Sequence, residues 1–427
     1  MDRYQPFPID PSWQQNFQPM EFVQNNPELI SGDHWQKPDR ERMAIYRYQR
    51  LQQEIIRYDC AGALLFSPMN VRYATETIYA PITNMHSPTR SVFVPDQGSA
   101  TLYDSAVDAL DWLPDFIGEC RQPPVTAYFI AGDSYADSSR RFAREIAHLI
   151  RFQGGSRRLA IDMAEPELIL ALNSEGMEIV NAEKIVERAA AIKSEDELRC
   201  ITTSVSIAQA GLSQIRQHLQ AGITEQALWA YLAYQNAING AGWFEYSILV
   251  SGQRTNPWGR ECSEKAIRAG ELVGVDTGMI GPGGYGADIS RTFYCQPGQP
   301  STEQKRLYQI AIENLSFNLE LIRAGMSFRE FAKKSWPVPP EFWVRRYNSV
   351  AHGVGMGNEW PHIPFATDWE KTDEREGVFE ENMVMAIESC IGREDGVECV
   401  KLEDMVVVKK GKCQLLSTFP FEDDLML

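Results

Sequence analysis

The most constraining feature of this 427-residue chain is a candidate hairpin that carries an aspartate on each strand. Asp276 ends the apolar run 272–275, and Asp288 opens the strand-like segment 289–293. Residues 278–286 contain five glycines and a proline, a composition typical of a tight turn that other groups approach closely. The pattern predicts an antiparallel pair of strands on which the two aspartates face each other.

Three further residues with metal-binding chemistry lie on or beside predicted strands. Glu388 follows the apolar run 384–387, and Glu403 lies inside the strand-like segment 400–406, so a second hairpin presents two more carboxylates. His352 lies in a turn of small residues that leaves its ring accessible. Taken singly, each of these acids is more often paired with an arginine or exposed at a strand end.

Together, four carboxylates and a histidine indicate a metal site. Carboxylates in apolar strands are unfavourable unless they are paired or bind metal. Two divalent ions, roughly 3.5 to 4 Å apart in the usual two-metal arrangement, would balance four negative charges. We therefore expect two divalent transition-metal ions. Mixed carboxylate and imidazole ligands accept iron, manganese, cobalt or zinc, so the sequence leaves the identity of the metal open.

Composition narrows the class of protein. The net charge of −17 repels nucleic acid and anionic membranes. No apolar stretch is long enough to span a bilayer, and the first residues lack a secretory signal pattern. Eight cysteines without a Cys-x-x-Cys pair are typical of reduced thiols. We expect a cytoplasmic protein that acts on a small molecule and binds neither nucleic acid nor membrane.

The length favours two domains. Residues 1–40 have no sustained period and predict an N-terminal arm that covers another surface, such as a second subunit. Residues 41–185 alternate short apolar runs, including 126–130, with helical segments, which predicts an α/β domain. Residues 186–427 predict a second domain in which helices pack on a mainly antiparallel sheet.

Two sequences have the spacing of a capping box and mark helix starts in the second domain. Ser194 and Glu197 are three residues apart, as are Ser301 and Gln304. Within one capping box, the side chain of each residue accepts a hydrogen bond from the free backbone amide of its partner three positions away. We expect a long helix after each box.

The five candidate ligands also match a known pattern. The segments Asp276-Thr277-Gly278, Asp288, His352-Gly353-Val354-Gly355, Glu388 and Glu403-Asp404 resemble, in order and spacing, the pita-bread metallopeptidase superfamily of creatinases, prolidases and aminopeptidases P. The resemblance covers about residues 186–420. It implies a creatinase-like N-terminal α/β domain and a C-terminal pita-bread α+β domain. It also implies these metal ligands: Asp276, Asp288, His352, Glu388 and Glu403.

Further segments resemble the DddP branch, the dimethylsulfoniopropionate lyases: 254–258, 352–361, 401–404, and in the first domain 70–75 and 84–88. This implies a metal-dependent lyase that converts dimethylsulfoniopropionate, or a similar small zwitterionic carboxylate, to acrylate and dimethyl sulfide. Two residues depart from the branch. Gly278 stands where these lyases carry an aspartate, and Asn358 stands where they carry the proposed base.

An amide such as Asn358 cannot accept a proton at neutral pH, so we expect the neighbouring Glu359, or a hydroxide on the metal, to act as base. Tyr347 is a further catalytic candidate because the lyases also carry a tyrosine five residues before the ligand histidine. Trp258 and Trp360 are candidates to surround a sulfonium through cation–π attraction, although ordinary core packing is the commoner role of such rings.

Quaternary structure and two alternative functions complete the expectations. We expect a homodimer in which the arm or the loop around His86 reaches the partner's active site, so His86 is a candidate substrate contact. The first alternative is hydrolysis of an Xaa-Pro bond or a related C–N bond, without the two histidines that such peptidases usually carry. The second is a catalytically silent pita-bread scaffold that binds a partner.

Overall fold

The computed structural model describes residues 37–78, 81–106, 112–153, 156–240, 242–369 and 376–426. Most of the predicted arm, residues 1–36, lies outside these ranges. The first described helix, α4 (Arg40–Arg57), begins after Asp39, whose side chain accepts a hydrogen bond from the Arg42 amide. No helix among the described residues is both long and apolar enough to cross a membrane.

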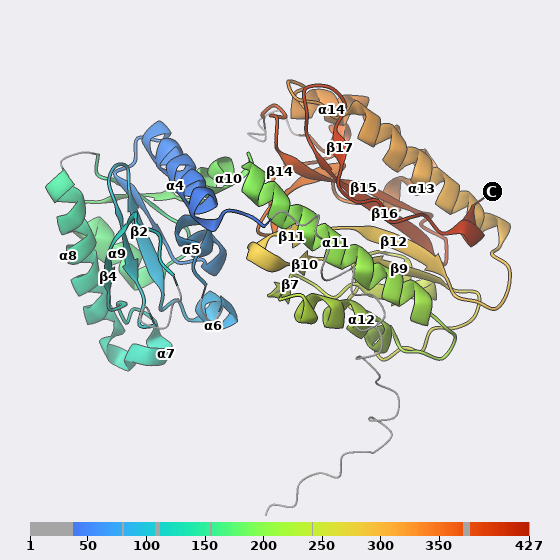
Figure 1. The fold of residues 1–427 in the computed structure, drawn as a ribbon, viewed down its shortest axis with the longest axis horizontal. Coiled ribbons are helices and arrows are strands. Elements are labelled where there is room, and N and C mark those ends of the chain that lie inside the picture. The colour runs from blue at the N-terminus through green and yellow to red at the C-terminus, as the bar shows by residue number, and fades with distance from the viewer. Residues whose placement is uncertain are drawn as a thin grey trace, which may run out of the picture. The chain divides into compact units, whose positions relative to one another are not determined.

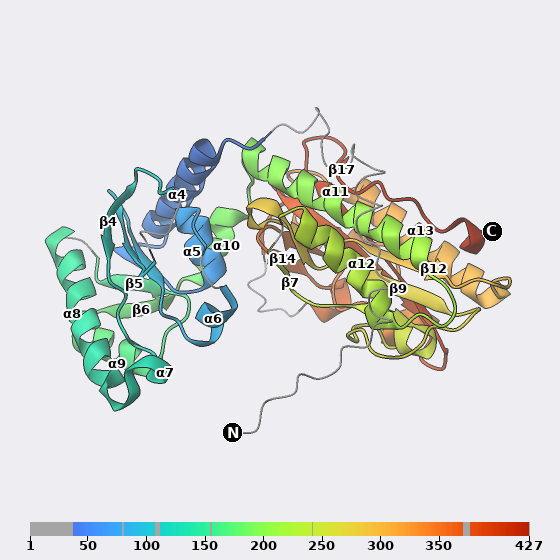
Figure 2. The ribbon, with the colours of Figure 1, turned by 60° about the horizontal axis from the view of Figure 1, so that its bottom comes forward.

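The first half of the chain is a mixed six-stranded sheet with helices on both faces (Figures 1 and 2). The strands lie in the order β4-β3-β2-β1-β5-β6. Their bounds are β1 (Gly62–Leu65), β2 (Ser91–Pro95), β3 (Ala100–Tyr103), β4 (Ile117–Arg121), β5 (Arg158–Ile161) and β6 (Glu178–Asn181). The helices are α4, α5 (Pro68–Thr75) and α10 (Glu183–Ala190) on one face, with α8 (Tyr135–Gln153) and α9 (Pro166–Ser174) on the other.

Side chains alternate in direction along β1, and this explains why helices pack on both faces of the sheet. In β1, Ala63 and Leu65 belong to the cluster of buried side chains that contains Met43 and Leu51 of α4. Leu64, which points the other way, belongs to the cluster with Phe142 of α8. The strand predicted within 126–130 is wrong, because the structure has helix α7 (Tyr128–Ala131) there with exposed side chains.

Both predicted capping boxes are present. Ser194 caps α11 (Glu195–His218), and Ser301 caps α13 (Thr302–Leu321). In each case the serine backbone amide also donates a hydrogen bond to the side chain of the third helical residue. Helix α12 (Glu225–Ile238) follows α11. The buried residues Ile201 and Val205 on one side of α11 pack in the same cluster as Leu228 of α12.

The strands of the second half pair antiparallel in three sheets, as predicted. The largest has the order β14-β13-β15-β16-β17, and the others are β12-β9-β8 and β11-β10-β7. Their bounds are β7 (Trp243–Phe244), β8 (Leu249–Ser251), β9 (Leu272–Asp276), β10 (Met279–Ile280), β11 (Gly286–Ala287), β12 (Ser290–Tyr294), β13 (Ala351–Val354), β14 (Asn358–Ile363), β15 (Val384–Gly392), β16 (Cys399–Val407) and β17 (Gln414–Leu415). Helix α13 packs against β15 and β16 (Figure 1).

Because successive side chains of a strand point to opposite faces, the acidic side chains of β15 and β16 point away from α13. Met385 and Ile387 pack in the cluster that contains buried residues of α13, so Glu388 projects from the opposite face of β15. In β16, Leu402 packs in that same cluster, so Glu403 also projects from the opposite face. The apolar residues that hold α13 therefore determine the direction in which both glutamates point. The domain boundary at residue 185 stays a prediction.

Candidate metal centre

Four strands and one connecting segment bring the five predicted ligands together. Glu388 and Glu403 lie directly opposite each other on β15 and β16, as the predicted hairpin requires. His352 of β13 lies opposite Ala386, so it shares a face with Glu388. Asp276 ends β9, where it is paired with Ser290 of β12.

Asp288 lies between β11 and β12, two residues before Ser290, so its side chain meets Asp276 from the adjacent strand. All five predicted ligands are buried, with at most 6% of each residue exposed. The two hairpins and β13 thus assemble one cluster of four carboxylates and a histidine from segments that are far apart in the chain, between positions 276 and 403.

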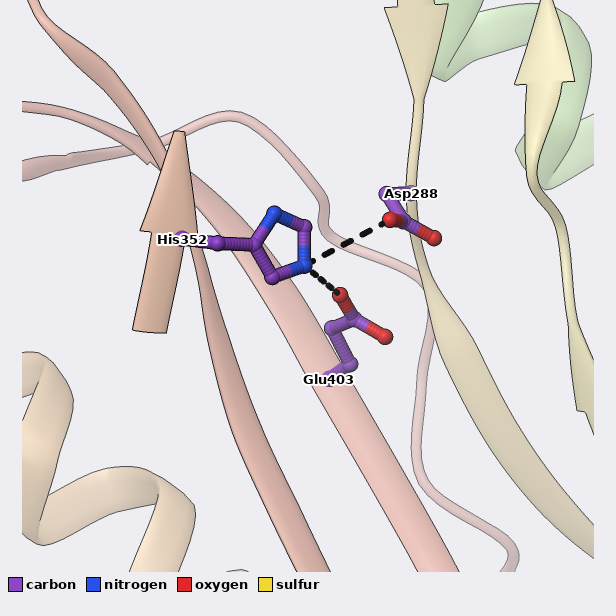
Figure 3. Close-up of side chains that lie close together, drawn as sticks. All are labelled: Asp288, His352 and Glu403. Carbon is purple, nitrogen blue, oxygen red and sulfur yellow. Dashed lines mark ion pairs between the residues drawn. The ribbon is translucent and has the colours of Figure 1, made fainter. Parts of the chain in front are cut away.

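His352 contacts three of these carboxylates, and Figure 3 shows it with two of them, Asp288 and Glu403. Its Nε2 lies 2.9 Å from Glu388 Oε1, 3.6 Å from Asp288 Oδ2 and 3.7 Å from Glu403 Oε1. Its Nδ1 lies 3.0 Å from the Gly353 carbonyl oxygen, which orients the ring. An imidazole that donates from Nδ1 offers a lone pair at Nε2, which is the form that binds metal.

These atoms fit a metal ion. Asp288, His352 and Glu403 each offer one ligand atom, and these atoms lie within 4.8 Å of one another. Among the described residues, Glu388 Oε1, Glu388 Oε2 and Glu403 Oε1 are buried oxygens without a hydrogen bond, and Glu388 has only ion contacts to His352 and Lys401. Buried carboxylate oxygens without a hydrogen bond are unfavourable in a metal-free protein, and divalent ions would satisfy them.

Burial and mutual repulsion also perturb the carboxyl groups. Burial raises the pKa of Asp276 to about 6, and burial together with Glu403 and Asp276 raises the pKa of Asp288 well above its usual range. Burial opposes ionisation of Glu403 too, but Lys401 and His352 outweigh it and hold its pKa at about 2. In the absence of metal, the aspartate pair therefore retains a proton more readily than Glu403 does.

A buried lysine that the sequence analysis missed lies inside the cluster. Lys401 Nζ is 2.5 Å from Glu388 Oε2 and 2.7 Å from Glu403 Oε2, and it donates a hydrogen bond of 2.9 Å to Ser290 Oγ. Its side chain is 0% exposed. Burial alone would lower the pKa of Lys401, but Glu388, Glu403 and Asp276 raise it above its ordinary value. Lys401 precedes Glu403 by two residues on the same strand, so the sequence could have indicated that both side chains lie on one face.

Two of the predicted aromatic residues lie against this lysine. Lys401 Nζ is 4.9 Å from the centroid of the Tyr347 ring and 5.9 Å from that of Trp258. The negative charge of Glu388 and burial raise the pKa of Tyr347. The cation that faces both rings in the structure is therefore the ammonium of Lys401 itself.

A tyrosine at the other side of the cluster was also missed. Tyr246 donates hydrogen bonds to Asp288 Oδ1 at 2.5 Å and to Asp276 Oδ1 at 3.3 Å. Burial raises the pKa of Tyr246 well above its usual range, so it remains a donor at neutral pH. Nothing in its own sequence neighbourhood distinguishes it from a strand tyrosine.

The structure separates the two candidates Asn358 and Glu359. Glu359 forms an ion pair with the buried Lys193, which holds its carboxylate. Asn358 lies at the exposed start of β14, and its backbone amide donates to Glu245 Oε1 and Oε2 at 3.3 and 3.2 Å. A carboxylate from the segment after β7 therefore lies beside position 358.

Glu245 differs from the other acids of this region in its surroundings. The residue is exposed, and no lysine or arginine of the described residues forms an ion pair with it. Partial burial of the carboxylate raises the pKa of Glu245, while the Asn358 amide and His352 act in the opposite direction.

The remaining candidates, Trp360 and His86, have other contacts. The Trp360 ring packs against Phe328, with centroids 5.2 Å apart, and the Arg188 guanidinium lies 3.8 Å above it. His86 ends the short helix α6 (Pro81–His86), is exposed, and has Nδ1 3.3 Å from Ser87 Oγ. Within the described ranges, neither side chain has a hydrogen bond or ion pair with the four carboxylates or with His352.

Comparison with known proteins gives the family. The profile of metallopeptidase family M24 matches residues 199–410, a span that contains all five candidate ligands. A dimethylsulfoniopropionate lyase DddP from Roseovarius nubinhibens is 31% identical over 396 residues, 91% of this chain and 89% of that protein. This chain belongs to metallopeptidase family M24.

Two other relatives of this M24 protein indicate how far the similarity extends. A dimethylsulfoniopropionate lyase DddP from Roseobacter denitrificans is 29% identical over 95% of the chain and 94% of that protein. An Xaa-Pro dipeptidase from Pyrococcus horikoshii is 28% identical over 56% of the chain and 66% of that protein. The predicted family and its DddP-like branch are thus confirmed.

Solved structures confirm the predicted pita-bread fold of the M24 protein. An Xaa-Pro dipeptidase from Bacillus anthracis superposes with a TM-score of 0.72 over 89% of this chain and 99% of its own, at 21% identity. The prolidase from Pyrococcus horikoshii gives a TM-score of 0.67 over 88% of this chain and 99% of its own. At this identity the likeness establishes the fold alone.

Proposed function

We propose that this M24 protein is a metal-dependent lyase that cleaves dimethylsulfoniopropionate, or a similar small zwitterionic carboxylate, to acrylate and dimethyl sulfide. The observation that carries the proposal is the extent of similarity. The two DddP lyases align with both halves of the chain, whereas the Xaa-Pro dipeptidase from Pyrococcus horikoshii aligns with 56% of it.

Two divalent transition-metal ions are part of this proposal. Asp276, Asp288, His352, Glu388 and Glu403 would hold them, since all five are buried and meet in one cluster. When bound, such an ion acts as a Lewis acid toward the substrate carboxylate and makes the neighbouring C–H group more acidic. Iron, manganese, cobalt and zinc all suit this mixture of oxygen and nitrogen donors.

In this proposal Glu245 is the general base. Glu359, expected from the sequence, is engaged by Lys193, while Glu245 has no cationic partner among the described residues and lies beside Asn358. In the proposed elimination Glu245 takes a proton from the carbon next to the carboxylate. The C–H electron pair forms the C=C bond of acrylate, and the C–S electron pair leaves with dimethyl sulfide.

The other candidate residues support this reaction less directly. The backbone amide of Asn358 donates to Glu245 and so holds the carboxylate in place. Tyr347 and Trp258 enclose the Lys401 ammonium, which contacts Glu388 and Glu403, so these rings position a part of the cluster. The proposed contacts of Trp360 and His86 with substrate would need a surface beyond the described residues, such as that of a partner subunit in the proposed cytoplasmic homodimer.

Hydrolysis of an Xaa-Pro bond is the second candidate. It is supported by the Xaa-Pro dipeptidases among the relatives and by Gly278, which stands where the lyase branch has an aspartate. The same metal site serves either reaction, because Lewis-acid activation suits a peptide carbonyl as well as a carboxylate.

Parallel assays of the metal-loaded protein separate the two functions. Headspace gas chromatography measures dimethyl sulfide released from dimethylsulfoniopropionate, and a second assay measures proline released from an Xaa-Pro dipeptide. We expect dimethyl sulfide release that is abolished by chelation and restored by metal. Proline release without dimethyl sulfide would replace the lyase proposal with the hydrolase.

A further inference from the structure

A cavity lies between helices α5 and α10 and the turn that joins β13 to β14. Its volume is about 140 Å³, well above the roughly 10 to 15 Å³ that one water molecule needs. Gly357 and Asn358 of the turn form one wall. The cavity therefore has room for a group of several non-hydrogen atoms next to the segment that carries Asn358.

The cavity adjoins Glu245, the proposed base, at Gly357. A Cβ atom added to Gly357 would lie 2.5 Å from Glu245 Oε1 and 2.7 Å from Met69 Cε. Met69 lines the cavity, so the missing side chain at position 357 leaves space in which the Glu245 carboxylate reaches the cavity wall. A substrate group held in the cavity would therefore lie next to Glu245.

Four glutamates line the cavity, and two of them are engaged by neighbouring groups of the protein. Glu359 forms an ion pair with Lys193. Glu197 accepts hydrogen bonds of 2.6 Å from the Tyr285 hydroxyl and from the Ser194 backbone amide. These two carboxylates therefore do not need a ligand to balance them.

The other two, Glu183 and Glu187, form no ion pair with a described lysine or arginine. They are four residues apart on α10 and lie on one face of that helix. Glu183 accepts a hydrogen bond of 3.3 Å from Asn70 Nδ2, and Glu187 accepts one of 2.6 Å from the Trp360 backbone amide. Burial is the largest cause that raises the pKa of both groups, and for Glu187 it outweighs the opposing effect of Lys193. A cation in the cavity would stabilise both carboxylates.

A buried hydroxyl at the cavity also lacks a partner. Tyr73 lines the cavity and is 3% exposed, and its hydroxyl has no hydrogen bond to any described residue. The Arg47 guanidinium lies 5.7 Å from the centroid of the Tyr73 ring, but it is engaged in an ion pair with Glu76. A buried hydroxyl without a partner is unfavourable unless a ligand or a water molecule contacts it. Tyr73 thus indicates an occupant independently of the two glutamates.

The apolar part of the lining indicates which kind of cation fits. It comprises these side chains: Met69, Val186, Ala190 and Met356. A calcium or magnesium ion takes about six or more oxygen ligands, whereas this lining offers two free carboxylates and one hydroxyl. A cation that carries methyl groups can contact the apolar side chains and the tyrosine rings while its charge faces the carboxylates.

We infer that this cavity binds a methylated onium group, a sulfonium or a quaternary ammonium, between Glu183, Glu187 and Tyr73. In the substrate of the proposed lyase, that group is the sulfonium end, held next to Glu245. This assignment of the natural ligand rests on the proposed function, but binding of the onium group itself does not.

Onium ions that lack a carboxylate test the inference separately from catalysis. Tetramethylammonium and trimethylsulfonium are titrated into chelated and into metal-loaded protein, and binding is followed by saturation-transfer difference NMR. The control probe is tert-butanol, which has a similar shape and no charge. We expect saturable binding of both onium ions, equal in chelated and metal-loaded protein, and no saturable binding of tert-butanol.

The inference is overturned if neither onium ion binds, if tert-butanol binds equally well, or if binding disappears on chelation, which would place the probe at the metal centre. These outcomes are independent of the lyase assay. Onium binding without dimethyl sulfide release would refute the proposed reaction and leave the binding site standing. Dimethyl sulfide release without onium binding would refute the binding site alone.

Variants of the two free glutamates locate the bound probe. Glu183→Gln and Glu187→Gln each remove one charge and keep a carbonyl oxygen for the hydrogen bonds from Asn70 and Trp360. Each should raise the Kd of tetramethylammonium about fivefold or more, because a carboxylate shielded from water attracts a cation more strongly than an exposed one.

The matched control is Glu394→Gln, which removes the same charge from the exposed turn between β15 and β16. It should change the Kd of tetramethylammonium by less than about twofold, because solvent and salt screen an exposed carboxylate. Equal effects in all three variants would show that the probe responds to the overall negative charge, and would overturn the inference. If a glutamate variant does not fold, the other variant and the wild-type titration still decide the question.

Discussion

Replacing Glu245 by glutamine tests the proposed base with little disturbance of the structure. The carbonyl oxygen of glutamine can still accept one of the two contacts of 3.2 and 3.3 Å that the Asn358 amide makes with the carboxylate. No ion pair with a described lysine or arginine is lost, so the free energy of unfolding should change by no more than about 0.5 kcal/mol. The substitution therefore removes a proton acceptor and little else.

The expected loss of activity follows from the role of a general base. Such groups contribute about a hundredfold to ten-thousandfold, which corresponds to about 2.7 to 5.4 kcal/mol of activation free energy. We expect kcat for dimethyl sulfide release to fall by this factor. The matched control is Glu359→Gln, which breaks the ion pair with Lys193 and should lower the melting temperature with little change in kcat.

The pH dependence provides a second readout. A base acts in its ionised form, so kcat/KM should fall as the pH decreases through the pKa of Glu245, which partial burial raises above its ordinary value of about 4.3. This acidic limb should be absent in Glu245→Gln. Adding Asn358→Asp to that variant places a carboxylate next to the vacant position and should restore part of the turnover.

Glu245 is not the base if Glu245→Gln retains kcat within about tenfold of wild type, or if the acidic limb of its pH profile is unchanged. The assignment is also refuted if Glu359→Gln, in folded protein, loses as much turnover as Glu245→Gln. Metal content measured on each variant shows whether a loss arises from the base or from an empty metal centre.

Three further predictions concern stability and assembly. Arg291→Met should lower the free energy of unfolding by about 3 to 5 kcal/mol in urea titrations, because it leaves the buried Asp404 without its partner at 2.7 Å. Arg306→Met loses only an exposed ion pair with Glu341 and should lower the free energy of unfolding by less than about 1 kcal/mol. The chelated protein should lose stability as the pH rises from about 4 to 6. The reason is that Asp276, with a pKa of about 6 when folded against about 3.9 when unfolded, binds more protons in the folded state over this range. A melting temperature that rises over this range would contradict the prediction. Light scattering should find a homodimer at micromolar concentration, and a monomer would refute the proposed role of the arm and the His86 loop.

Much of the architecture follows from local sequence. The capping boxes at Ser194 and Ser301 start helices because their hydrogen bonds connect residues only three positions apart. The opposition of Glu388 and Glu403 follows from the period of two along strands, once the apolar residues beside them face a helix. The short run 126–130 failed as a strand because a few apolar residues do not distinguish a strand from a helix.

The neighbours of the acids were decided only by tertiary structure. Tyr246, Glu245 and Lys401 reach the centre from separate segments, and no local pattern indicates that a tyrosine will donate to Asp288 or that a glutamate will lie beside Asn358. Residue types and their spacing along the sequence were thus enough to identify the four carboxylates and the histidine as one candidate set of metal ligands. Which oxygens remain open to a metal depends on long-range contacts, because hydrogen-bond donors act over only about 3 Å and come from strands distant in sequence.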